Sequence, residues 1–206
     1  MALAHEGQVR ADIRRLERTH NEHVLAMLDG LFATAPIGVA DVEVVGFGCG
    51  PGSFTGVRIA AAITQAIAVA ADAAVVPVAS SMVWVASARR ASDAGEWLCG
   101  VRSRGEAYYL SRYHVAGDDI QEVAADVLYE AWPSEIELPA TFAFVGDAPP
   151  WLLPMARDAH VECVPDATAF LELVRVAHGR GESLGAEQAL PSYVRGDSPW
   201  RAAGAR

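Results

Sequence analysis

The chain has 206 residues, of which 52% are hydrophobic and 20% charged, with 18 glycines and 11 prolines. This composition excludes disordered, collagen-like and disulfide-rich proteins, and the length allows one large domain or two small ones. The formal net charge of −10, from 26 acidic and 16 basic residues, disfavours unaided binding of a nucleic acid. Such binding depends on basic groups that displace counterions from phosphates.

All 16 basic residues are arginines, because the sequence contains no lysine. A Walker-type phosphate loop and Schiff-base catalysis both require a lysine and are therefore excluded. The three cysteines, Cys49, Cys99 and Cys163, form no Cys-x-x-Cys pair, which predicts free thiols and a cytoplasmic protein. No leader opens the chain, and Thr64 and Gln65 interrupt the longest apolar stretch, so we expect no membrane insertion.

The N-terminal residues alternate between apolar and polar types. Val9, Ala11 and Ile13 are separated by charged residues, which is the two-residue period of a half-buried strand. Gly7 offers a turn from a preceding strand over residues 2–5, so this segment predicts a β-hairpin.

A helix is predicted over residues 20–35. Thr19 and Glu22 form a T-x-x-E capping box before it, and Pro36 with Gly38 closes it. Its apolar positions recur at helical spacing. They are Val24, Leu25, Leu28, Leu31 and Phe32.

A strand over residues 42–47 leads through a glycine cluster into a second predicted helix over residues 54–71. Nearly every face of this helix is apolar or small, so it must be covered on more than one side. One side can pack on a sheet, and the other requires a second helix or a partner chain. Ala62, Ala66 and Ala70 form a stripe that permits close approach of another backbone. The alternative is a central helix that its own fold buries completely.

The remaining sequence predicts further alternation of strands and helices. We expect strands over 75–78, 97–101, 107–115 and 142–145, helices over 81–88 and 167–178, and a polar loop over 117–126. Asp166 would cap the last helix and Gly179 would end it. This order indicates an α/β fold with an antiparallel hairpin in each half.

The glycine-rich segment over residues 48–58 is the most informative one for function. Its position between a strand and a helix suits binding of an anion at the helix N-terminus. The dinucleotide fingerprint fails because Ser53 stands where a third glycine is needed. The nucleophile elbow fails because Pro51 and Thr55 replace its glycines. A rigid strand-to-helix turn without chemistry is the alternative.

Other candidate residues give weaker signals. His20 and His23 could share a metal, but no further ligand lies nearby in the sequence, which favours a solvated or interfacial pair. Asp147 follows Gly146 as in an ordinary turn, and Cys99 has no recognisable partner base. Arg102, Arg104 and Arg112 form a basic cluster that is typical of a solvated surface.

The run GPGSFTGVRI over residues 50–59 resembles the TsaB family, also called YeaZ. Four weaker stretches occur in the order that the family shows: His20–Leu25, Val78–Met82, Gly105–Tyr108 and Leu190–Arg195 with Trp200. The resemblance extends over almost the whole chain. It implies an actin-like, RNase H-like (ASKHA) α/β fold with two subdomains, here residues 1–88 and 89–206.

The resemblance also implies a function. The chain would be a non-catalytic subunit that pairs with its catalytic paralogue TsaD, which transfers threonylcarbamoyl to adenosine 37 of tRNA. TsaE, an ATPase, would join the complex, and the isolated chain would form a homodimer through the same surface. No cofactor is implied for this chain alone, ADP or ATP at the subunit boundary is left open, and tRNA would be contacted only indirectly.

The resemblance assigns residues to two regions and names no catalytic residue and no metal ligand. The partner interface would comprise His20, Val24, Leu28, Leu31, Phe54, Arg58, Ala62, Gln65 and Ala66. The family motif loop would comprise Gly50, Pro51, Gly52, Ser53, Phe54, Thr55 and Gly56.

The sequence departs from the family pattern at several places, of which two bear on fold and activity. Family members begin with a strand similar to L-A-L-D-T-S, whereas residues 1–4 here resemble the second strand, so we expect the first strand to be missing. The family's D-A-R before a hairpin turn is replaced by Val101, Arg102 and Ser103, which makes ATP hydrolysis by this chain alone unexpected. Two alternative functions remain: a metal- or nucleotide-dependent, peptidase-like hydrolase, and a self-associating dimer with no TsaD role.

Overall fold

The computed structural model describes residues 1–14, 20–133 and 138–194. Its α-helices are α1 (His20–Ala33), α2 (Phe54–Ala71), α3 (Ser80–Ala88), α4 (Leu153–Ala156) and α5 (Ala167–Gly179). Its strands are β1 (Ala2–His5), β2 (Gln8–Ala11), β3 (Val44–Gly50), β4 (Ala74–Ala79), β5 (Glu96–Arg102), β6 (Tyr108–Ala116), β7 (Asp119–Tyr129), β8 (Ala143–Gly146) and β9 (His160–Val161). Three short 3-10 helices are η1 (Val39–Asp41), η2 (Arg89–Ala91) and η3 (Ala186–Gln188).

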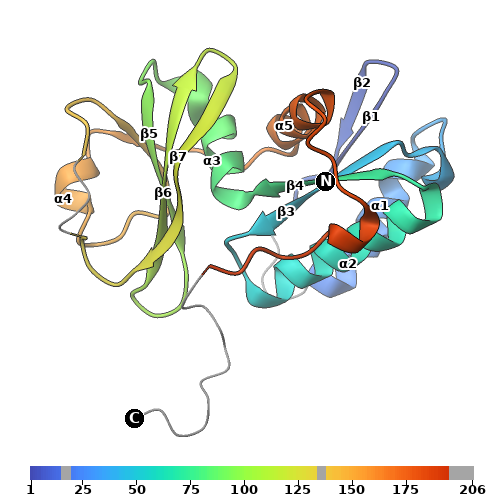
Figure 1. Cartoon of the computed structure of the whole chain (residues 1–206), viewed down its shortest axis with the longest axis horizontal. Coiled ribbons are helices and arrows are strands. Elements are labelled where there is room, and N and C mark those ends of the chain that lie inside the picture. Colours follow the sequence, from blue (N-terminus) through green and yellow to red (C-terminus); the bar gives the residue numbers. More distant parts are fainter. Residues whose placement is uncertain (15–19, 134–137, 195–206) are drawn as a thin grey trace, which may run out of the picture.

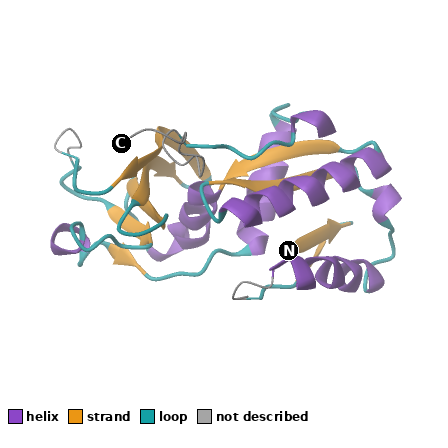
Figure 2. Ribbon diagram, turned by 90° about the horizontal axis from the view of Figure 1, so that it is seen from below, coloured by secondary structure: helices purple, strands orange, loops and turns teal. Residues whose placement is uncertain are grey.

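The strands before α3 form two separate two-stranded sheets. The antiparallel hairpin β1–β2 turns at Glu6 and Gly7, both with positive φ, and β3 runs parallel to β4. In Figure 1, α2 lies below β3 and α5 lies above it. Figure 2 shows α1 beside the N-terminal hairpin, whereas α2 follows β3 and β4. This half therefore has helices on both faces, as buried parallel strands require.

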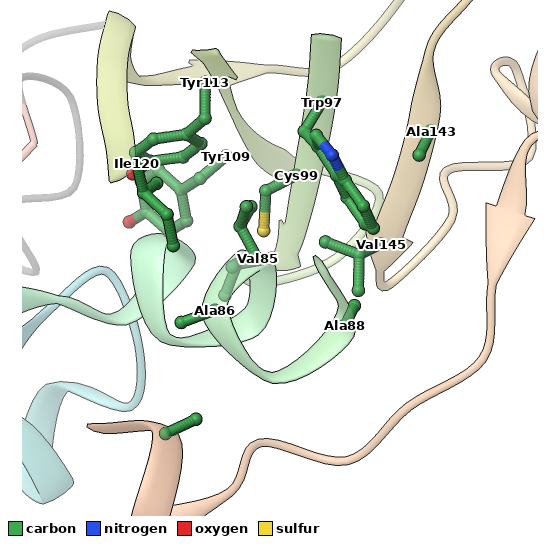
Figure 3. Close-up of a cluster of buried hydrophobic side chains, with 12 residues drawn as sticks. Val85, Ala86, Ala88, Trp97, Cys99, Tyr109, Tyr113, Ile120, Ala143 and Val145 are labelled. Atoms are coloured by element: carbon green, nitrogen blue, oxygen red, sulfur yellow. The ribbon is translucent and has the colours of Figure 1, made fainter. Parts of the chain in front are cut away.

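The later strands form one mixed five-stranded sheet in the order β7-β6-β5-β8-β9. Its core faces α3 and contains large side chains that are almost fully buried: Trp97, Tyr109 and Tyr113 are each at most 1% exposed. Figure 3 shows these side chains gathered over α3 together with Cys99 and Val145. Burial of such aromatic residues is the main favourable contribution to the stability of this half.

Most sequence predictions agree with these elements. The hairpin, α2 with bounds at residues 54 and 71, and α5 with Asp166 as its N-cap are confirmed. α1 ends at Ala33, two residues before the predicted end. The capping residue Thr19 lies outside the described residues, and the division at residues 88 and 89 stays a prediction.

The predicted loop over residues 117–126 is wrong, because most of this segment belongs to β7. Gly117 has a φ of 63° and makes the turn from β6, with which β7 pairs in antiparallel fashion. β7 is an edge strand whose outer residues remain exposed, so its polar composition did not indicate a strand. The short elements α4 and β9 were not predicted either.

Candidate interaction site

The glycine-rich turn connects the end of β3 to the start of α2. Gly50 has a φ of 118°, and a Cβ atom there would lie 3.0 Å from the backbone oxygen of Ser192, so both its conformation and its surroundings require glycine. Ser53 caps α2, since its Oγ accepts a hydrogen bond from the N–H of Gly56 at 3.3 Å. The turn therefore fixes the direction in which α2 leaves the sheet.

The C-terminal residues 189–194 cross the same turn. The N–H of Ser192 donates to the carbonyl oxygen of Cys49 at 2.8 Å, and Ala189 is fully buried in a cluster with Phe47 and Val75. This crossing brings Tyr193 close to the first turn of α2. Residues that are distant in sequence thus form one surface at the start of the helix.

Arg58 lies at the centre of that surface. Its guanidinium carbon lies 3.2 Å from the centroid of the Phe54 ring and 5.1 Å from that of the Tyr193 ring. Its Nη1 also donates to the carbonyl oxygen of Phe54 at 3.1 Å. Phe54 and Tyr193 remain 39% and 55% exposed. Stacked arginine and aromatic side chains of this kind are enriched among the residues that dominate protein interfaces.

α2 presents three different faces. Ala61, Thr64 and Ala68 are its buried residues and face the fold. A second face, with Ile59, Ile63 and Ile67, lines a cavity. The third face is solvent-exposed and defines the surface that we call the outer face: Phe54, Arg58, Ala62, Ala66, Val69 and Ala70.

Only 17% of the residues of α2 are buried, although its mean hydropathy is 1.5 over 18 residues. By length and composition alone it is the one helix in the described ranges that could cross a membrane, although Thr64 and Gln65 interrupt its apolar residues. Core helices of water-soluble proteins meet the same criterion. The sequence prediction that α2 needs a cover beyond its own sheet is consistent with its low burial.

The predicted interface residues divide between two sides of the molecule. Phe54, Arg58, Ala62 and Ala66 lie on the outer face, and Gln65 beside them is half-buried. Those of α1 point the other way, because Val24, Leu28 and Leu31 line the cavity and Leu31 is only 6% exposed. The α1 part of the predicted interface therefore stays a prediction, and the large apolar side chain of α1 that is exposed is that of Leu25, at 59%. The side chain of His20 lies outside what the structure describes.

The candidate catalytic residues have structural roles in the fold. Asp147 accepts a hydrogen bond from the backbone N–H of Arg102 at 2.9 Å through its Oδ2. Burial raises the pKa of all three thiols, most strongly for the fully buried Cys99, which keeps them protonated and weakly nucleophilic. Arg112 pairs with Glu96 at 3.6 Å instead of joining Arg102 and Arg104. Among the described residues, no three His, Cys, Asp or Glu side chains form a metal site.

A buried polar cluster was missed at the sequence level. The Oγ of Ser81, at the start of α3, lies 2.7 Å from the hydroxyl of Tyr113 and donates to Oδ2 of Asp126 at 2.7 Å. Burial raises the pKa of both Asp126 and Tyr113, and their hydrogen bonds with Ser81 oppose that shift. Since Asp126 lies in β7, the incorrect loop prediction concealed this cluster.

Comparison with known proteins identifies the family. Residues 14–133 match the family model described as TsaD: tRNA N6-adenosine threonylcarbamoyltransferase. The chain is 27% identical to the tRNA threonylcarbamoyladenosine biosynthesis protein TsaB of Haemophilus influenzae, over 98% of this chain and 90% of that protein. It is 24% identical to TsaB of Escherichia coli, over 98% of this chain and 91% of the relative.

Solved structures give the same result. A Pseudomonas aeruginosa protein described as similar to the peptidase YeaZ superposes with a TM-score of 0.83 and 27% identity, over 94% of this chain and 93% of that one. YeaZ from Pseudomonas aeruginosa gives a TM-score of 0.79 and 26% identity, with 94% and 92% covered. The expected actin-like α/β fold is thereby confirmed. The chain belongs to the family that the threonylcarbamoyltransferase model describes and, within that family, to the TsaB (YeaZ) proteins.

Proposed function

We propose that this chain takes part in tRNA threonylcarbamoyladenosine biosynthesis as a non-catalytic subunit that pairs with TsaD. The family membership and the names of the curated relatives support the pathway. The outer face of α2 supports the pairing, and it is the single observation on which this part of the proposal depends. The isolated chain would use the same face to form a homodimer.

The outer face has the composition of an interface. Val69 is 75% exposed and Phe54 39%, and the small residues Ala62 and Ala66 between them let a partner helix approach closely. Exposed apolar surface is costly in water, and a specific interface needs roughly 800 Å² from each partner. An 18-residue helix with neighbouring aromatic residues can supply a large part of that area. Arg58, stacked between two rings, would be its central anchor.

The chemistry of the chain supports a non-catalytic role. The hydroxyl of Ser53 caps a helix, the Asp147 carboxylate binds a backbone N–H, and the cysteine thiols are held protonated. The catalytic groups would therefore come from TsaD, with TsaE joining the complex and ADP or ATP bound at the boundary between subunits. A chain of net charge −10 without lysine would leave most tRNA contacts to these partners.

The substitution Ala62→Glu tests the pairing. A carboxylate at the centre of the outer face would be buried without a partner in the complex, so the affinity for TsaD should fall at least about tenfold. Ala91→Glu, at an exposed alanine of η2, adds the same charge elsewhere and is the matched control. Affinity is measured by titration calorimetry, and tRNA modification by reconstitution with TsaC, TsaD and TsaE.

Two results would reject the assignment. Unchanged affinity of a folded Ala62→Glu protein would show that the outer face is not the interface. Normal modification in a mixture that lacks this chain would show that TsaD does not need it. Circular dichroism and thermal unfolding establish that both variants are folded.

A further inference from the structure

The C-terminal segment over residues 189–194 holds Tyr193 in place from both sides. Figure 1 shows this segment, in red, running from η3 past the start of α2 to the five-stranded sheet. The N–H of Ser192 donates to the carbonyl oxygen of Cys49 at 2.8 Å, and Val194 packs against the core of that sheet. Because these contacts flank it, Tyr193 keeps its ring at the first turn of α2 although it is 55% exposed.

Little space is left between this segment and the start of α2. Phe54 and Tyr193 line the same small cavity together with Val57 and Val194, and its volume is about 10 Å³. A cavity needs about this volume to hold a single water molecule, so this one cannot receive a small-molecule ligand. The two aromatic residues therefore act on their neighbours in the chain and on whatever covers the outer face.

The neighbour that both rings contact is Arg58, the one charged residue of α2. Its guanidinium carbon lies 3.2 Å from the centroid of the Phe54 ring and 5.1 Å from that of the Tyr193 ring, and Nη1 donates to the carbonyl oxygen of Phe54. This hydrogen bond uses one of the five N–H donors of a guanidinium. Arg58 forms no ion pair within the described ranges, so donors on its edge remain for another molecule.

We propose that Tyr193 is a positioning residue: together with Phe54 it holds the guanidinium of Arg58 in place to receive a carboxylate from TsaD. The inference rests on the proposed pairing and adds the chemistry of the partner, an apolar helix with one acidic side chain opposite Arg58. The outer face has no acidic residue of its own, so the complex would otherwise bury Arg58 without a countercharge. A guanidinium binds a carboxylate through two parallel N–H bonds.

Stacking in the free chain lowers the cost of ordering Arg58 in the complex. An arginine side chain loses many rotamers when an interface buries it, and this loss weakens binding. The two rings and the carbonyl oxygen of Phe54 already restrict Arg58 before TsaD is bound. Loss of the Tyr193 ring should therefore weaken binding even if Tyr193 itself contacts no atom of TsaD.

Relaxation of the Arg58 Nε–H group by NMR measures this restriction in the free chain. Arg58→Lys identifies its signal among those of the 16 arginines. At a concentration where sedimentation shows monomers, the order parameter should be near that of a rigid backbone, about 0.85, and should fall below about 0.6 in Tyr193→Ala. Tyr193→Phe keeps the ring and should keep this value. Leu190→Ala, at an exposed residue of the same segment, is the second control.

Calorimetric titration with TsaD tests the link to binding. Tyr193→Ala should weaken the affinity about threefold to tenfold, whereas Tyr193→Phe and Leu190→Ala should bind as the parent does. If TsaD supplies a carboxylate, the affinity of the parent falls as the NaCl concentration rises, because salt screens the ion pair. Arg58→Met should remove most of this dependence.

Three results would overturn the inference: an unchanged Arg58 order parameter in Tyr193→Ala, parent-like affinity of that variant, or equal salt dependence in Arg58→Met and the parent. The Ala62→Glu variant in the same titrations separates this failure from that of the proposed function. Where Ala62→Glu loses binding, the proposed pairing stands although the inference fails. Where a folded Ala62→Glu binds TsaD as tightly as the parent, both fail, because the outer face is then not the interface.

Discussion

The two halves of the molecule differ in how completely their strands form a continuous, buried sheet. The five-stranded sheet is continuous, and its core contains Trp97, Tyr109, Tyr113 and Phe144, each at most 1% exposed. The earlier strands are split into two pairs with a large cavity between them, and few residues of the long helix beside them are buried. One half completes its own core, whereas the other leaves a cavity and an exposed apolar helix face.

The largest expected effect is a loss in the free energy of unfolding that differs between the cores of the two halves. Trp97→Ala should lower the free energy of unfolding by about 3–5 kcal/mol, because it leaves a void in a closely packed region. Leu28→Ala should cost less than about 2 kcal/mol, because Leu28 already borders a cavity and has fewer packing partners to lose. Urea denaturation followed by circular dichroism measures both. Equal losses would mean that the two halves are equally well packed.

A smaller effect concerns the turn that directs α2. Gly50→Ala should destabilise the protein by about 1–3 kcal/mol, since alanine is strained at a φ of 118° and its Cβ would approach the Ser192 oxygen. Gly30→Ala is the control within α1, where a Cβ meets no atom within 4 Å, and it should stabilise by up to about 1 kcal/mol. Thermal unfolding measures both changes. A Gly50→Ala variant as stable as the parent would show that the turn does not require glycine at this position.

The smallest effect is a change of pH dependence in the buried cluster. Burial holds the pKa of Asp126 above its ordinary value of 3.8, so its contribution to stability is fully present below that pH and is lost as the pH rises through the raised value. Asp126→Asn keeps an acceptor for Ser81 and removes this loss. The variant should therefore gain stability relative to the parent between acidic and neutral pH.

Urea denaturation at a series of pH values tests this sign. The control is Asp158→Asn, which removes one negative charge from an exposed position. If the stability difference between Asp126→Asn and the parent stays constant with pH, the prediction that burial raises the pKa of Asp126 is wrong. A difference that grows toward acidic pH would reverse the assigned direction of the shift.

The sequence predicted elements well where local signals were strong. α2 was placed with both ends correct, because a glycine cluster precedes it and apolar residues fill it. In the structure Asp72 ends the helix in the left-handed conformation. β7 was missed, because an edge strand is stabilised by its pairing with β6 and needs little apolar character of its own. The polar cluster at Asp126 was not predicted for the same reason, since Asp126 lies in β7.

The candidate site was predictable only in part. The glycine-rich turn and the alanine stripe of α2 followed from sequence pattern, and the motif loop, Phe54 and Arg58 from the family resemblance. The inward orientation of Leu31 depends on which side of α1 meets the rest of the fold. The stacking of Arg58 with Tyr193 joins residues 135 positions apart and rests on the crossing of the C-terminal segment. Such contacts arise from tertiary packing and leave no local periodicity.

The return of the C-terminal segment over the first strands has a consequence for the order of events during synthesis. α5 contacts β4 and β3, and Ala189 packs against Val75, so these partners of the early strands are translated last. The middle sheet, β5 to β9, has all its strands available as soon as residue 161 has left the ribosome. Since chains are made from the N-terminus at about 5–20 residues per second, the middle of this protein can fold before its beginning does.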